Sequence, residues 1–250
     1  MEEILLTIFT GALTGLSSGM FGIGGSVVAT PVLKLLIGMA PIIALATPIP
    51  AAIPSAASGS FLYYRNNLIN FKLAGSVLIT AIPFSWFGSW TTQYVDGTAL
   101  IVAKAIFLVF LGLKFFISSW LFRTKEEEQR ISITGSLISG AIAGYVAGIL
   151  AVGGGIVLVT AFRKVNRIKM KEAVATSLAC VFILAIVSSI KHYDLGHIDL
   201  NITLILAATV IPFSMLGAKI AVSLRNKTLE RAFGAAMIIF AIFFIITQVY

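Results

Sequence analysis

The sequence predicts an all-α integral membrane protein, a polytopic helical bundle of two inverted-topology repeats with broken or re-entrant helices at glycine-rich motifs. The 250 residues are 58% hydrophobic and only 11% charged, with a mean hydropathy of +1.02, whereas soluble domains carry about 25% charged residues. Apolar stretches near the ~20 residues that cross a bilayer recur along the chain, without the polar–apolar alternation of barrel strands. In addition, the first half of the chain recurs in the second.

This internal repeat has a constant offset and needs no gap. The segment GLSSGMFGIGG at 15–25 reappears as GYVAGILAVGG at 144–154, and the tetrapeptide IPFS at 82–85 reappears unchanged at 211–214. Gly19 therefore corresponds to Gly148 and Thr47 to Thr176, an offset of 129 positions in each case. Residues related by this offset are called counterparts. A duplicated membrane chain with matched glycine breaks is typical of secondary transporters.

We expect six long spans and one broken unit at the start of each half. The long spans cover residues 41–63, 73–94, 99–122, 173–190, 200–224 and 229–249. The broken units are 4–19 followed by 26–38, and 131–148 followed by 156–162. The pieces after the breaks are too short to cross a bilayer alone, so each unit is either one broken spanning helix or a re-entrant hairpin. The predicted domains are a first transmembrane repeat, 1–121, a linker, 122–130, and a second transmembrane repeat, 131–250.

The placement of lysine and arginine distinguishes these alternatives. If each broken unit crosses once, the two membrane faces receive 10 and 7 basic residues, but if each is re-entrant or crosses twice they receive 14 and 3. Basic residues concentrate in cytoplasmic loops, so the second arrangement fits better. It predicts inverted repeats with both termini outside and the linker in the cytoplasm. It also explains the net charge of +8 without nucleic-acid binding, for which the chain has no soluble basic domain.

The glycine breaks are the first candidate for a substrate-binding site. A helix that begins inside a membrane presents unpaired N–H groups and the positive end of its dipole, and glycine lets a ligand approach the backbone. An anion can be held there without a full buried cation. The candidate residues are Gly22, Gly24, Gly25 and Ser26 in the first half and Gly153, Gly154 and Gly155 in the second. The alternative is close helix packing, which we assign to the outer ladders Gly11, Gly15, Gly19 and Gly140, Gly144, Gly148.

Hydroxyl groups follow each break in the next helix. Thr47, Thr176 and Ser177 could donate to a bound anion, or could bond back to their own helix, as is common in membranes. Pro48 removes a backbone donor beside Thr47, which favours a broken helix that faces a cavity. We expect Ser85 and Ser214, which follow repeated prolines, to cap the helix kinks locally.

Lys114 lies near the middle of a predicted span, where a charge costs at least ~2.5 to 3.5 kcal/mol. No acid lies at a comparable depth, so a bound anion is a candidate partner; the alternative is snorkelling to the interface. Lys104 and Lys219 lie nearer the ends of their predicted spans, and we expect both to snorkel.

Other chemistry has little support in the sequence. His192 and His197 share a predicted outer loop with Asp194 and Asp199, but their spacing matches no tight metal-ligand pattern. No nucleophile, base and orienter can be assembled, and no phosphate-binding loop motif occurs. We therefore expect no enzyme activity, no metal and no cofactor.

The doubled motifs resemble those of the TauE/SafE sulfite exporter-like family, also called the 4-toluene sulfonate uptake permease family. GIGGSVVATP at 22–31 is similar to the first family motif, GILAVGGG at 148–155 to the second, and ALAT at 44–47 and AVATS at 173–177 to the segments that follow. Two departures are Ser26, where a third glycine is common, and Thr160, where the first motif has Pro31. The resemblance implies a cytoplasmic-membrane permease for sulfite, thiosulfate or organosulfonates.

The resulting hypothesis is a secondary transporter that moves a small sulfur-containing anion across the cytoplasmic membrane by alternating access, with the anion held between the inverted halves. The alternatives are a membrane-embedded sensor or partner protein that binds the anion without moving it, and an anion channel. The sequence leaves open whether H⁺ or Na⁺ is the coupling ion and whether the protein forms a homo-oligomer.

Overall fold

The computed structural model describes residues 2–121 and 132–249, with side chains for 2–113 and 132–244. The predicted linker, 122–130, lies outside the described residues. The described first half contains α1 (Glu2–Phe21), α2 (Ser26–Leu36), α3 (Pro41–Ala46), α4 (Pro48–Arg65), α5 (Phe71–Thr91), the 3-10 turn η1 (Thr92–Tyr94) and α6 (Gly97–Leu121). The second half contains α7 (Ile133–Ile149), α8 (Gly155–Lys164), α9 (Met170–Asp194), α10 (Leu200–Ser223) and α11 (Asn226–Val249).

The helices confirm the predicted all-α membrane fold. By length and composition, five segments of the described chain can cross a membrane: Glu2–Phe21, Pro41–Arg65, Phe71–Tyr94, Met170–Asp194 and Leu200–Ser223. Shorter apolar helices cover Ser26–Leu36, Gly97–Leu113 and Ile133–Ile149. Both predicted glycine breaks separate a longer helix from a short one, α1 from α2 and α7 from α8.

The first half has a helix break that its counterpart lacks. The segment before Arg65 divides at Thr47, which ends α3 and precedes α4, whereas α9 runs without interruption through Thr176. Pro48 explains the difference, because proline has no N–H and clashes with the preceding turn, while its counterpart Ser177 continues the helix.

Helix pairs pack in a pattern that recurs between the halves. α1 packs along α10, and their counterparts α7 and α5 pack along each other, while α4 contacts α9 and α6 contacts α11. A Cβ on Gly15 would lie 2.9 Å from the Cα of Val210, and one on the counterpart Gly144 would lie 2.7 Å from the Cα of Ala81. The outer glycines therefore serve close packing, as predicted.

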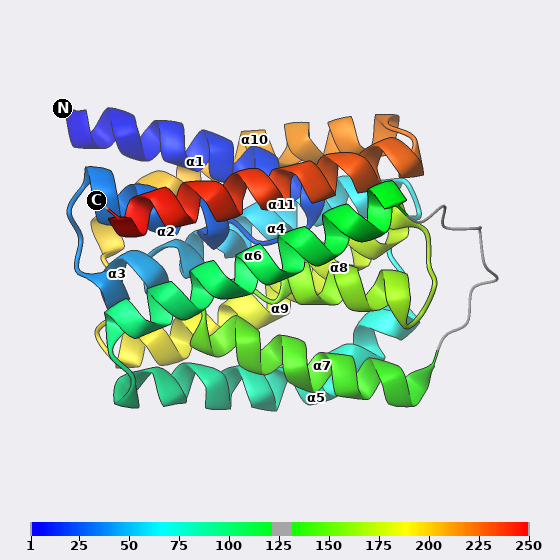
Figure 1. The fold of residues 1–250 in the computed structure, drawn as a ribbon, viewed down its shortest axis with the longest axis horizontal. Coiled ribbons are helices and arrows are strands. Elements are labelled where there is room, and N and C mark those ends of the chain that lie inside the picture. The colour runs from blue at the N-terminus through cyan, green and yellow to red at the C-terminus, as the bar shows by residue number, and fades with distance from the viewer. Residues whose placement is uncertain (1, 122–131, 250) are drawn as a thin grey trace.

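The short helices begin inside the bundle and extend toward its two ends. Figure 1 shows that α1 begins and α11 ends at the same end, that α2 and α3 lie toward that end, and that α8 lies toward the opposite end. The interior at the breaks is apolar, with Ile23, Val152 and Ile156 fully buried. This arrangement places the starts of α2 and α8 in the core rather than at a surface.

Candidate functional site

The two glycine breaks meet in the interior of the bundle. A Cβ on Gly24 would lie 3.5 Å from the Cα of Gly153, and a Cβ on Gly153 would lie 3.6 Å from the Cα of Gly24. Both residues have left-handed backbones, with φ of +70° and +72°. Glycine is required at both positions, because the turn needs positive φ and the two chains approach closely.

Side chains and backbone atoms also connect one break to the other. The Ser26 hydroxyl donates to the carbonyl oxygen of Ala151, which is the counterpart of Gly22. At the position equivalent to Ser26, Gly155 lies against Gly22, and a Cβ there would lie 2.8 Å from the Cα of Ile23. The Ser177 hydroxyl donates to the carbonyls of Gly22 and Val174, at 3.1 Å and 2.9 Å.

The starts of α2 and α8 have uncapped amides. Gly25 and Gly154 precede the two helices, and neither start receives a side-chain cap. In the described ranges, no acceptor pairs with the first-turn amides of α2 (Ser26, Val27, Val28) or α8 (Gly155, Ile156, Val157). Ser26, Val27 and Val28 are at most 5% exposed. A buried unpaired donor costs about 1 to 3 kcal/mol, so these amides are suited to a ligand that carries acceptor oxygens.

Gly25 and Gly154 themselves face their own hairpins rather than the opposite break. A Cβ on Gly25 would overlap the methyl group of Thr14, and one on Gly154 would lie 3.0 Å from the carbonyl oxygen of Ala143, the counterpart of Thr14. Their contribution is therefore to let α1 approach α2, and α7 approach α8. The break residues that come together across the halves are Gly22, Gly24, Ser26, Gly153, Gly155 and Ser177.

The hydroxyls of Thr47 and Thr176 contact distant loops rather than the backbone of their own helices. Each hydroxyl oxygen accepts a hydrogen bond from a backbone amide in a distant loop, Thr47 from Asp199 at 3.1 Å and Thr176 from Asn70 at 3.0 Å. Asp199 is the counterpart of Asn70, so the contact occurs once in each half. The two threonines therefore hold the loops that lead into α10 and α5.

The prediction that Ser85 and Ser214 cap local kinks is wrong. Ser85 is 2.9 Å from the hydroxyl of Ser188 on α9, and Ser214 donates to the carbonyl of Ser55 on α4 at 2.6 Å. Both serines are fully buried. Their hydroxyls therefore connect neighbouring helices, α5 with α9 and α10 with α4.

Lys104 is the functional candidate that sequence analysis missed. The prediction that it snorkels is wrong, because the side chain is fully buried. Its Nζ donates to Thr30 Oγ1 at 2.8 Å and to the carbonyl of Ser26 at 3.3 Å. Lys104 therefore contacts the first residue of α2, beside the place where the two breaks meet. Lys219 is exposed on α10, and Lys114 lies in α6 with its side chain outside the described residues.

A histidine pair lies behind the second break. His192 Nε2 is 3.3 Å from the carbonyl of Gly148, and the Nδ1 atoms of His192 and His197 are 3.3 Å apart. In the first half, Tyr63 is the counterpart of His192 and Gly19 is the counterpart of Gly148. There the Tyr63 hydroxyl donates to the carbonyl of Gly19 at 2.7 Å. Partial burial lowers the pKa of His197, in the loop after α9, below its ordinary value. Within the described residues, no group of three metal-ligating side chains occurs.

Comparisons with known proteins find one family and several relatives. A family model described as "Sulfite exporter TauE/SafE" matches residues 7–244. A "Probable membrane transporter protein" of Haemophilus influenzae is 27% identical over 262 residues, covering 96% of this chain and 97% of that protein. A similarly named protein of Methanocaldococcus jannaschii is 25% identical over 240 residues, covering 90% of this chain and 89% of the relative. One from Bacillus subtilis is 24% identical over 243 residues, covering 91% and 92%.

Proposed function

This chain belongs to the sulfite exporter TauE/SafE family, and we propose that it is a secondary transporter that moves a small sulfur-containing anion (sulfite, thiosulfate or an organosulfonate) across the cytoplasmic membrane by alternating access. Membership of a membrane transporter family supports movement of a small substrate through the bilayer rather than catalysis. The choice of sulfur rests on the description of the family and on the motif resemblance.

The observation that carries the proposal is the meeting of two uncapped helix starts. Gly24 and Gly153 lie against each other, and the amides that follow them begin α2 and α8 without side-chain caps. Each start contributes about half a positive charge from the helix dipole. Oxygens of a sulfur anion would accept from these amides. The hydroxyls of Thr47, Thr176 and Ser177, together with Gly22, Gly25, Gly154, Gly155, Ser26 and Lys114, complete the proposed substrate-binding set.

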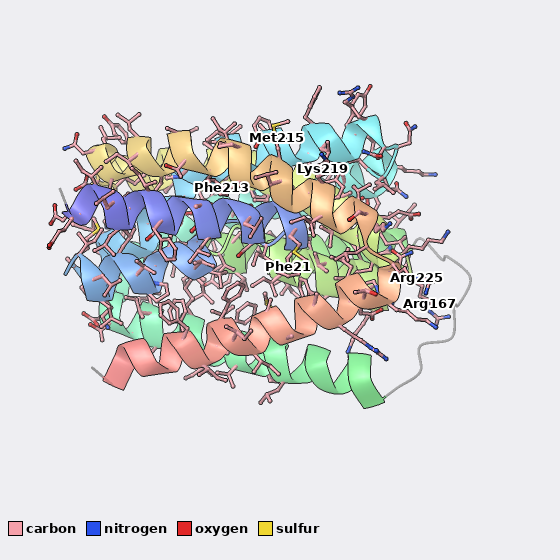
Figure 2. All side chains as sticks on the ribbon, turned by 90° about the horizontal axis from the view of Figure 1, so that it is seen from above. Phe21, Arg167, Phe213, Met215, Lys219 and Arg225 are labelled. Carbon is pink, nitrogen blue, oxygen red and sulfur yellow. The ribbon has the colours of Figure 1, made fainter. Side chains whose placement is uncertain are left out.

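Alternating access is supported by the paired construction of the bundle. α1 begins and α11 ends at one end, and α2 and α8 extend toward opposite ends. Arg167 and Arg225, in the loops after α8 and α10, lie at the end opposite the start of α1 (Figure 2). By the positive-inside rule, that end is proposed to face the cytoplasm, with both termini outside. In this proposal the halves are inverted, and one rocks against the other around the anion.

A binding and flux experiment tests this function. Purified protein is heated with sulfite, thiosulfate, methanesulfonate, sulfate or acetate, because a ligand that binds the native state raises its melting temperature. Uptake of the stabilising anion is then measured in proteoliposomes. We expect a sulfur anion to stabilise the protein and to be taken up at a saturable rate. Stabilisation without flux would favour the sensor, non-saturating flux would favour the channel, and no stabilisation would contradict the anion site.

One variant addresses the helix start directly. Val27→Pro removes one amide donor from the first turn of α2 while keeping similar apolar volume, and proline is tolerated in a first turn. Since a hydrogen bond to a charged group is worth about 1.5 to 3 kcal/mol, we expect the Kd for the anion to rise roughly tenfold or more. Leu200→Pro is the matched control, because it places proline at the first residue of α10, away from the breaks. Equal Kd values in both variants would show that the amides of α2 do not bind the anion.

A further inference from the structure

Lys104 is a charged residue in the interior of a membrane protein. Its side chain is among the largest fully buried ones in the described chain. The ammonium has two hydrogen bonds, to Thr30 Oγ1 at 2.8 Å and to the carbonyl of Ser26 at 3.3 Å, and lies 5.8 Å from the ring centroid of Phe244. Hydroxyl, carbonyl and ring contacts solvate the cation, but they do not neutralise it.

No carboxylate neutralises this charge in the part of the chain that the structure describes. Glu230 pairs with Arg163 at 3.0 Å. The described acids lie in loops or near helix ends, and the hydrogen bonds of the Lys104 ammonium go to Ser26 and Thr30 instead. Burying an unpaired ammonium costs several kcal/mol. The adjacent start of α2 adds a dipole of the same sign.

Packing alone does not explain a lysine at this position. The counterpart of Lys104 is Phe233, which is fully buried and packs edge-to-face on Phe21, with ring centroids 5.9 Å apart. The repeated fold therefore accepts an apolar side chain there. The two contacts of Lys104 on α2, Ser26 and Thr30, have the counterparts Gly155 and Val159. A hydroxyl, a second hydroxyl and an ammonium thus gather in the first half, where the second half has none of them.

We infer that Lys104 is the cationic ligand of the transported anion, and that the anion takes the place of Thr30 on its ammonium. This inference rests on the proposed transport function and narrows its substrate class. One ammonium without a carboxylate is neutralised by one negative charge, so the site is selective for a sulfonate monoanion over a dianion or a neutral molecule of similar shape. A tetrahedral sulfonate has one oxygen for the ammonium and two for the amides of the helix starts.

The first test uses the native protein and needs no variant. Stabilisation is titrated with methanesulfonate, a monoanion, with sulfate, a dianion, and with dimethyl sulfone, a neutral molecule of similar shape. We expect methanesulfonate to bind at least ~10-fold more tightly than dimethyl sulfone, which forms no charge-assisted hydrogen bond. We also expect it to bind more tightly than sulfate, whose second negative charge would be buried without a partner. Equal affinity for dimethyl sulfone, or tighter binding of sulfate, would overturn the inference.

The second test removes the charge and keeps its size. Lys104→Gln should raise the Kd for methanesulfonate at least ~10-fold, while Lys104→Arg, which keeps the charge, should recover much of the affinity. Lys219→Gln is the matched control, because Lys219 is an exposed lysine in the membrane helix α10 (Figure 2). Thr30→Val removes one of the two hydrogen-bond partners of the ammonium, the one that the anion is proposed to replace, so the Kd should stay equal or fall. If Lys104 only held α2 in place, Lys104→Gln and Thr30→Val would both lower the melting temperature and leave the Kd unchanged.

The outcomes separate this inference from the function on which it rests. Native protein that binds and transports methanesulfonate, together with a Lys104→Gln variant of unchanged affinity, would overturn the role of Lys104 and leave the transporter intact. Native protein that responds to none of the sulfur anions would overturn both. If Lys104→Gln does not fold, the preference of the native protein among the three probes decides the question.

Discussion

The two glycine breaks share left-handed residues at two matched positions and differ at a third, where Gly25 has φ of −70° and its counterpart Gly154 has φ of +71°. They also differ in chemistry. Gly24 and Gly153 have φ of +70° and +72°, and Gly22 and its counterpart Ala151 are also left-handed, at +66° and +50°. Around the first break, however, the structure places Ser26, Thr30 and the buried ammonium of Lys104. Around the second, the same positions hold Gly155, Val159 and Phe233.

This difference separates what the fold requires from what the site requires. The backbone turns recur because both short helices must begin inside the bundle, and glycine supplies the conformation and the clearance. The charged and hydroxyl groups do not recur, so packing does not demand them. A duplicated scaffold with its charge in one half would bind one anion rather than two, since the breaks meet at a single place. The breaks can be tested as a matched pair.

The largest loss of stability is expected from a substitution that gives the second break a residue of the first. Gly155→Ser introduces the residue of its counterpart, but the new Cβ would overlap the carbonyl oxygen of Gly22 and approach the Cα of Ile23 at 2.8 Å. Backbone atoms cannot move aside as a flexible side chain can, so we expect a loss of about 3 kcal/mol or more. The measurement is the yield and melting temperature of purified protein in detergent.

The reciprocal change, Ser26→Gly, is the control. It removes the hydroxyl that donates to Ala151 and leaves a buried carbonyl with one partner fewer, a cost of roughly 1 to 3 kcal/mol. It introduces no overlap. A Gly155→Ser variant as stable as Ser26→Gly would mean that the two breaks are interchangeable, and the contrast between them would fail.

A smaller loss of stability, equal in the two halves, is expected from a contact that both halves share. Thr47→Val and Thr176→Val each remove the acceptor of a loop amide, that of Asp199 or that of Asn70. Valine is close to threonine in shape, so each variant should lose about 1 kcal/mol through the unpaired donor. Melting temperatures of the two variants, measured side by side, check this. A large difference between the two melting temperatures would show that the two loop contacts do not stabilise the protein equally.

Much of the fold follows from the sequence because the bilayer imposes simple length and composition rules. The constant offset identifies the counterparts, and the glycine pattern locates both breaks within a few residues of their positions between α1 and α2 and between α7 and α8. Helix ends shift by a few residues because capping groups, such as the side chain of Asn70 before α5, are not part of the hydropathy pattern.

The site was harder to predict, because the sequence does not record which face of a helix is covered. Lys104 lies only two turns from the start of α6, so snorkelling was the simpler interpretation. Its side chain contacts α2 and α11, and hydropathy does not encode this packing. The signal that could have identified it is the repeat itself: lysine aligned with an apolar Phe233, together with hydroxyls at Ser26 and Thr30, one turn apart on α2.

The smallest expected effect is a pH dependence of the folding stability, which arises from residues of the second half alone. His192 and His197 are counterparts of Tyr63 and Leu68, so the first half has no titrating pair at this position. Partial burial lowers the pKa of His197, and its Nδ1 lies 3.3 Å from that of His192, so the folded state favours the neutral ring. As the pH falls below the ordinary histidine pKa of about 6.5, the unfolded chain binds the proton more readily than the folded chain, and stability falls.

Melting temperatures between pH 8 and pH 5, without substrate, measure this slope. We expect a decline on the acidic side that His197→Gln reduces. Tyr63→Phe, which removes the corresponding contact to Gly19, lowers the melting temperature at every pH and keeps the slope, because neither residue titrates in this range. A slope that persists in His197→Gln would assign the pH dependence to another group. A rise in stability on acidification would contradict the sign of the lowered pKa.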